Sequence, residues 1–149
     1  SMLLTSCYFI GPVDSDIKTE NVDFNSDNII GTWKLDKFSY EYLSRKEKTD
    51  SIYITFNKDK TFVLNNSNSL FLSNTNENIK SKQNGIIDNI QSKGNWSITD
   101  IPHNKTIELT FDNKVIQSDF SVFQKENEYQ IWYFFGDPDS GERLRFMKN

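Results

Sequence analysis

Short runs in which apolar and polar residues alternate fill most of the chain, and they restrict its fold more than any other feature. The clearest two are residues 52–56 and 61–64, and the segment between them, 57–60, consists of Asn, Lys and Asp. A two-residue period predicts a strand with one buried face, and Asn and Asp between two such runs predict a hairpin turn. No segment has a convincing helical period of about 3.6 residues. The chain is therefore expected to be all-β.

The other alternating runs continue to the end of the sequence at the spacing expected of an antiparallel barrel. They cover residues 33–42, which need a bulge near 36–37 to keep the apolar side chains on one face, and residues 86–90, 94–99, 106–111, 120–123, 129–135 and 142–147. Together with the hairpin they predict about eight to ten antiparallel strands, a pattern that alone fits both a single up-and-down β-barrel and a sandwich. A polar turn at 25–30, which ends in two Ile residues, is expected to form one turn of helix that caps an open barrel end.

The composition suits one domain with an aromatic core. Of the 149 residues, twelve are Phe, six are Tyr and three are Trp, and such side chains bury a large area each and favour strands. The net charge is −4, and Lys is spread along the chain. The chain therefore lacks the positive field on which nucleic-acid binding depends. We expect a monomer with no nucleic-acid partner.

Residues 1–28 differ from the rest and are expected to be a flexible linker, with the barrel domain over 29–149. Cys7 is the single cysteine, and the Leu, Thr and Ser before it resemble a bacterial lipobox, the motif whose cysteine is acylated. Residues 11–28 contain Pro, Ser and five acids with little apolar periodicity, as a tether would. No stretch approaches the roughly 20 apolar residues that span a membrane, so we expect membrane contact only through a lipid on Cys7. The alternative is a coincidental tetrapeptide.

Groups that could carry catalysis or bind a metal are scarce. The sequence contains one His, His103, and one Cys, and it has neither an HExxH nor a GxSxG motif. Residues 137–141 begin like a calcium-binding loop, but Lys148 stands where the Glu that closes such a loop should be. A hairpin turn explains this segment better. We expect no enzymatic activity, no metal site and no cofactor.

Two motifs resemble the lipocalin and fatty-acid-binding (calycin) superfamily. A Gly-x-Trp sequence, Gly31 to Trp33, opens the first strand and recurs at 94–96, and Arg143 and Arg145 stand on the last strand. These motifs are most similar to those of short bacterial lipocalin-like lipoproteins, and the resemblance implies that the strands close into a single up-and-down β-barrel rather than a sandwich. In lipocalins this Trp packs against an Arg of the last strand and closes one barrel end, so the resemblance implies the same role here, with a cation–π attraction of about 0.5 to 2 kcal/mol. The alternatives are an Arg that binds an anionic ligand and an exposed strand face.

The expected function is non-enzymatic binding of a small apolar molecule inside the barrel, by a protein held at the bacterial cell envelope through its lipidated cysteine. Phe56, Phe62, Tyr133 and Phe135 are the aromatic side chains expected to line the cavity, with few polar contacts to orient the ligand. The alternative is a protein-interaction or scaffold module of the envelope, with a self-filled barrel and an Asn-rich recognition segment at 65–84. A cavity of about 300 Å³ or more would favour the ligand, and a filled interior would favour the module.

Overall fold

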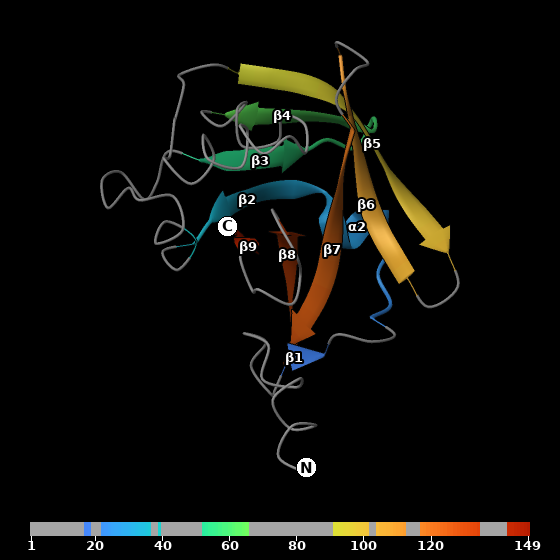
Figure 1. Ribbon diagram of the computed structural model, residues 1–149, viewed down its shortest axis with the longest axis vertical. Helices are drawn as coiled ribbons and strands as arrows, with labels where there is room; N and C mark the ends of the chain where they lie inside the picture. The colour runs from blue at the N-terminus through green and yellow to red at the C-terminus, as the bar shows by residue number, and fades with distance from the viewer. Residues whose placement is uncertain are drawn as a thin grey trace, which may run out of the picture.

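The computed structural model of the chain is built almost entirely of strands (Figure 1), as the alternation predicts. It describes residues 17–18, 22–36, 39, 52–65, 91–101, 104–112, 117–134 and 143–149. In chain order the elements are β1 (Ile17–Lys18), α2 (Ser26–Ile29), β2 (Gly31–Leu35), β3 (Tyr53–Phe56), β4 (Thr61–Asn65), β5 (Gln91–Ile101), β6 (Asn104–Phe111), β7 (Gln117–Lys125), β8 (Glu128–Phe134) and β9 (Arg143–Lys148).

Eight of these strands close into a barrel. Each strand from β2 to β9 is antiparallel to the next along the chain, and β9 returns to pair with β2. At this closure Trp33 lies opposite Lys148, and Leu35 lies opposite Phe146. β1 pairs with β7 beyond the part of β7 that β6 covers. The predicted antiparallel up-and-down barrel is therefore confirmed, with eight strands in the closed ring.

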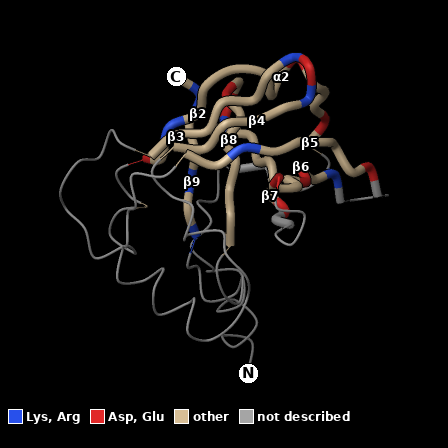
Figure 2. The backbone as a smooth tube through the Cα atoms, turned by 90° about the horizontal axis from the view of Figure 1, so that it is seen from above, with Lys and Arg blue, Asp and Glu red and all other residues tan. Residues whose placement is uncertain are grey.

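Alternating apolar residues of the strands form the core. Ile54 and Phe56 of β3, and Phe62 and Leu64 of β4, are fully or almost fully buried, whereas the residues between them are partly exposed. This is the pattern of a sheet with one buried face and one face toward solvent, because successive side chains of a strand point to opposite faces. In the described part of the chain, positions with Lys or Arg and positions with Asp or Glu are interspersed along the backbone (Figure 2).

One turn of helix caps the barrel, as the polar turn at 25–30 predicts. The Asn25 side chain accepts hydrogen bonds from the backbone N–H groups of Asp27 and Asn28, and Asn28 Oδ1 accepts from the Asn25 N–H at 2.9 Å. This capping box satisfies N–H groups that the first turn of a helix leaves free. Ile29, the last residue of α2, is fully buried in the core. The helix thus closes one end of the barrel, called the α2 end below.

Trp33 fastens α2 to the barrel wall. Its indole N–H donates to the Ile29 carbonyl at 2.7 Å, and its side chain is fully buried. Gly31, which lies between the two residues, has a φ of +131°. Glycine reaches this conformation without the strain that a side chain would bring. The first Gly-x-Trp sequence therefore encodes the sharp turn from the helix into β2.

The second Gly-x-Trp sequence repeats this arrangement. Trp96 donates its indole N–H to the Asn57 carbonyl at 3.0 Å, and Lys60 Nζ lies 4.0 Å from the centre of the Trp96 ring. A Cβ atom at Gly94 would lie 2.0 Å from a backbone carbonyl oxygen of β6. β5 and β6 therefore approach too closely at this point for any residue other than glycine.

The two ends of the barrel differ in their connections. At the α2 end, short turns join β3 to β4 and β7 to β8. At the opposite end, the chain passes from β2 to β3, from β4 to β5, from β6 to β7 and from β8 to β9, mostly through residues outside the described part. The Asn-rich segment 65–84, apart from Asn65, and most residues of the expected linker 1–28 lie outside the described residues. The described part of that linker packs on the barrel, because β1 pairs with β7 and the side chains of Val22 and Phe24 are buried in the core.

Candidate functional site

Phe56 and Phe62, two of the four aromatic residues predicted to line a ligand cavity, lie in the barrel interior near α2. Phe56 meets Trp96 edge to face, with ring centres 5.5 Å apart, and Phe62 meets Phe111 in the same way at 5.1 Å. Aromatic pairs favour this geometry and this separation. At this level of the barrel the described side chains therefore pack against one another.

Tyr133, the third of the four, lies on the inward face of β8. Its ring packs edge to face on Phe120 at 5.5 Å, and its exposed fraction is 7%. Burial raises the pKa of Tyr133 to about 12, because a phenolate would lose its hydration in apolar surroundings. Phe135, the fourth, lies outside the described residues. The wall around Tyr133 thus offers a ligand apolar surface and one neutral hydroxyl group.

The cation over Trp33 is a lysine and not one of the two predicted arginines. Lys148 Nζ lies 5.5 Å from the centre of the Trp33 ring. Lys148 shares the inward side of β9 with Phe146, whereas Arg143 and Arg145 project from the other side of that strand. Because alternate residues of a strand point to opposite faces, neither Arg is directed toward Trp33. Lys148 therefore takes the place that the resemblance assigns to an Arg.

Arg143 belongs instead to an aromatic cluster on the outer face of the barrel. Its guanidinium carbon lies 4.4 Å from the centre of the Trp132 ring, and Trp132 packs against Phe123 and Phe134. Trp132 lies next to the inward-facing Tyr133 in β8, and so it points outward. Both Trp132 and Arg143 are nonetheless almost completely buried, at 0% and 1%. A cation stacked on Trp in such dry surroundings stabilises this outer layer.

Arg145 joins the last strand of the barrel to the end of the first. Its Nε donates to Asp36 Oδ2 at 2.6 Å, while Asp36 Oδ1 accepts from the backbone N–H and the hydroxyl of Ser39 at 2.9 and 2.6 Å. The Ser39 oxygen in turn accepts from the backbone N–H of Arg145 at 2.7 Å. We call these three residues the β2–β9 clasp. Hydrogen bonds that involve charged groups are the strong ones, so the clasp holds the barrel closed.

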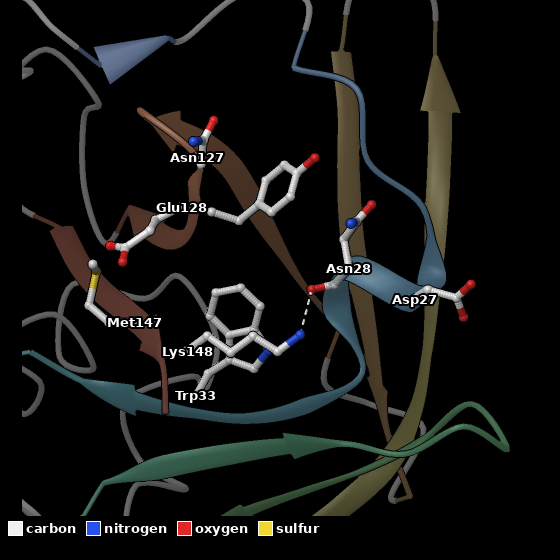
Figure 3. Close-up of a pocket in the computed structure, with 8 residues that line it drawn as sticks. Asp27, Asn28, Trp33, Asn127, Glu128, Met147 and Lys148 are labelled. Carbon is white, nitrogen blue, oxygen red and sulfur yellow. Dashed lines mark hydrogen bonds between the residues drawn. The ribbon is translucent and has the colours of Figure 1, made fainter.

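A surface cavity of about 360 Å³ lies at the α2 end, outside the barrel interior (Figure 3). This volume is near the lower end of the range for small-molecule sites, roughly 300 to 1,000 Å³. Its lining residues are Asp27, Asn28, Trp33, Asn127, Glu128, Tyr129, Met147 and Lys148. They meet only because β9 returns to β2, so no local sequence pattern predicts this cavity.

Lys148 and Tyr129 shape the cavity. The Lys148 side chain crosses over Trp33, which is fully buried beneath it, and its ammonium group donates to the Asn28 carbonyl at 3.0 Å (Figure 3). The Tyr129 hydroxyl donates to the Asp23 carbonyl at 2.9 Å, which holds the ring at the cavity wall. Trp33 is therefore the floor of the cavity, and the methylene chain of Lys148 separates it from solvent.

Among the described residues, two carboxyl groups, those of Asp59 and Asp119, have shifted pKa values, and neither lies at this cavity. Hydrogen bonds from the Thr61 hydroxyl and backbone N–H lower the pKa of Asp59 in the turn between β3 and β4. Burial, and to a lesser degree the charge of Glu108 directly opposite, raise the pKa of Asp119 on β7. Local turn and strand geometry explains both shifts.

Within the described residues, no group of three or more His, Cys, Asp or Glu side chains could hold a metal ion. No helix in that part of the chain is long and apolar enough to cross a bilayer. His103 and Cys7 lie outside the described residues, and so the expectations for them remain predictions.

The likeness to lipocalins rests on architecture. The chain forms a closed barrel of eight antiparallel strands, a helical turn caps one end, and the Trp of the first Gly-x-Trp sequence bonds to that turn. These features are consistent with a lipocalin-like fold. Comparison of the chain with protein-family models, with curated proteins and with solved structures finds no match.

Proposed function

We propose that this protein is a non-enzymatic binding protein that holds a small apolar molecule inside a lipocalin-like barrel. The observation that carries the proposal is the closed barrel, whose described inner wall consists of aliphatic and aromatic side chains. α2 and Trp33 close one end, so the ligand enters at the other end. Removal of apolar surface from water supplies the affinity, and the Tyr133 hydroxyl orients the molecule.

The proposal includes attachment to the bacterial cell envelope through a lipid on Cys7. The lipobox-like sequence before Cys7 supports this assignment, and the residues between Cys7 and β1 give the length for a short tether. Such a tether would let the barrel face the solvent while the acyl chains lie in the membrane.

A protein-interaction module is the second candidate, because aromatic rings of the described interior pack against each other. Phe56 on Trp96, Phe62 on Phe111, and Phe120 on Tyr133 are edge-to-face pairs within the interior. If the same packing continues to the opposite end, the barrel is a rigid support for its connecting segments, and recognition lies in those segments.

Organic extraction of the purified full-length protein, followed by mass spectrometry, tests the ligand. An apolar molecule should be extracted, and its removal should lower Tm. At a hundredfold excess over Kd a ligand stabilises the fold by about 2.7 kcal/mol, which is about 5 to 10 °C for a domain of this size. Tyr133→Phe should change the affinity for the readded molecule, and Tyr53→Phe, on the outward side of β3, is the matched control. No extractable molecule, with an unchanged Tm across fatty acids, sterols and haem, would favour the interaction module.

Mass spectrometry of the protein expressed in bacteria with its native leader tests the anchor. Cys7 should carry acyl chains, and the protein should fractionate with membranes. Cys7→Ser is the control and should move the protein to the soluble fraction. An unmodified Cys7 in a soluble wild-type protein would end the lipoprotein assignment, while leaving the ligand proposal standing.

A further inference from the structure

The geometry points to the surface cavity at the α2 end as a separate binding site for a small, flat molecule with an acidic group at one end and an amine at the other. This inference does not depend on a ligand in the barrel interior. It follows from which charges border the cavity, where they lie, and what separates them.

Three charged residues, Asp27, Glu128 and Lys148, line the cavity, and the charged groups of the last two lie on opposite sides of it. Figure 3 shows the Lys148 ammonium beside Asn28 at one side and the Glu128 carboxylate near Met147 at the other, while Asp27 points away. Both Glu128 and Lys148 are exposed, and within the described part of the chain neither forms an ion pair. One N–H of the ammonium group donates to the Asn28 carbonyl, which leaves two for a ligand.

A ligand with a single charge suits this arrangement poorly. A cationic ligand that has no acid group can bind Glu128, but it forms no bond with Lys148 and is repelled by the ammonium group. An anion on Lys148 is repelled by Glu128 in the same way. A molecule with both charges satisfies both groups through charge-assisted hydrogen bonds, which are stronger than neutral ones. The site therefore selects a zwitterion.

Tyr129, Met147 and the Lys148 methylene chain give the cavity apolar surface, beside the polar side chains of Asn28 and Asn127. The Tyr129 hydroxyl is engaged by the Asp23 carbonyl, so this residue presents its ring. Met147 contributes a polarizable side chain, and the Lys148 methylene chain covers the buried Trp33. A cavity of about 360 Å³ holds one aromatic ring between the two charged groups.

An aromatic cage for a quaternary ammonium group is the main rival, and burial argues against it. Such cages bind the cation on exposed ring faces. Trp33 has no exposed surface, and Lys148 already places its own ammonium over that ring at 5.5 Å. A second cation at the same face would meet like charge.

Titration of ¹⁵N-labelled full-length protein with para-aminomethylbenzoate, followed by NMR, tests the inference. The probe has the required acid, ring and amine. Saturable shifts should concentrate at the Glu128, Tyr129, Met147 and Lys148 amides and at the Trp33 indole N–H, with a Kd of about 1 mM or tighter. Two matched probes each lack one charge: para-methylbenzoate has no amine and para-methylbenzylamine has no acid. Each should bind at least about tenfold more weakly, since each loses one charge-assisted hydrogen bond.

Variants separate the two halves of the site. Glu128→Gln should weaken the zwitterion about tenfold and leave para-methylbenzoate binding unchanged or stronger. Lys148→Met should abolish the preference for a ligand with an acid group. Lys148→Arg keeps the cation and should retain binding of the zwitterion, so it tests the role of the charge even if Lys148→Met impairs folding. Glu126→Gln and Lys93→Met, at exposed positions outside the cavity, are the matched controls. The inference fails if the three probes bind equally, if para-methylbenzoate binds best, or if no saturable shift occurs at about ten times the expected Kd.

Discussion

Replacement of Trp33 by Phe should destabilise the barrel more than the same replacement at Trp96. The Trp33 indole bond to the Ile29 carbonyl is short, at 2.7 Å, and fully buried, whereas the Trp96 bond to the Asn57 carbonyl is 3.0 Å and partly buried. Trp33→Phe leaves a buried carbonyl without its donor, at a cost of about 1 to 3 kcal/mol. The smaller ring also leaves a void at the base of α2, which adds about 1 to 2 kcal/mol.

The expected loss for Trp33→Phe is therefore about 2 to 5 kcal/mol, which corresponds to a fall in Tm of about 5 to 20 °C. Trp96→Phe should lose about 1 to 2 kcal/mol, because water can replace the donor at a partly exposed site. Urea denaturation followed by far-ultraviolet circular dichroism measures the free energy of unfolding of both variants. Circular dichroism is used because each substitution removes a Trp and so alters the fluorescence signal. An equal or smaller loss at Trp33 would refute the reasoning that this residue fastens the helical cap.

Three further substitutions have defined outcomes. Gly94→Ala should cost about 3 kcal/mol or more, because the new Cβ would meet the Thr110 carbonyl oxygen at 2.0 Å, and a wild-type Tm would contradict this. Asp36→Asn should cost about 1 to 3 kcal/mol in urea denaturation through its bond to Arg145, and most of that cost should vanish in an Arg145→Gln background. The raised pKa of Tyr133 means that the neutral phenol contributes stability in full below about pH 10 and that this contribution is lost as the pH rises to about 12. Urea denaturation across that range should show a steeper decline for the wild type than for Tyr133→Phe.

Much of the architecture was predictable because the strands obey local rules. The hairpin of β3 and β4 follows from alternation on both sides of a turn that contains Asn57 and Asp59, and the structure places both strands there. The cap was predictable from the polar residues before Ile29. Closure of the sheet into a ring was not a local property, since it requires β9 to return to β2, and it was expected only from the resemblance to calycins.

The partner of Trp33 shows where the sequence argument failed although the signal was present. The expectation placed Arg143 or Arg145 over that ring, but Leu144 and Phe146 mark the inward side of β9, and Lys148 is the next residue of the same parity. A stricter use of the two-residue period would have selected the lysine. By contrast, the burial of Arg143 was not predictable. Its position on the outward side of β9 suggests an exposed side chain, but the guanidinium group packs on the outer aromatic cluster around Trp132.

The surface cavity lay beyond sequence reasoning for a different reason. Glu128 and Lys148 stand at strand ends, the first residue of β8 and the last residue of β9, where single charged residues are ordinary. Their placement on two sides of one space depends on the register of β8, β9 and β2 together, and alternation alone leaves register open by steps of two residues.

The β2–β9 clasp also bears on the order in which this chain folds. It joins Asp36 to Arg145, which are 109 positions apart, whereas the hairpins β5–β6 and β7–β8 pair neighbouring segments. Contacts between distant residues require the closure of a long loop and therefore form late. We therefore expect the sheet to assemble from its hairpins and the pairing of β2 with β9, which closes the ring, to form last. Amide hydrogens of β2 and β9 should exchange with solvent earlier than those of β5 and β6, because the last seam to form is also the first to open.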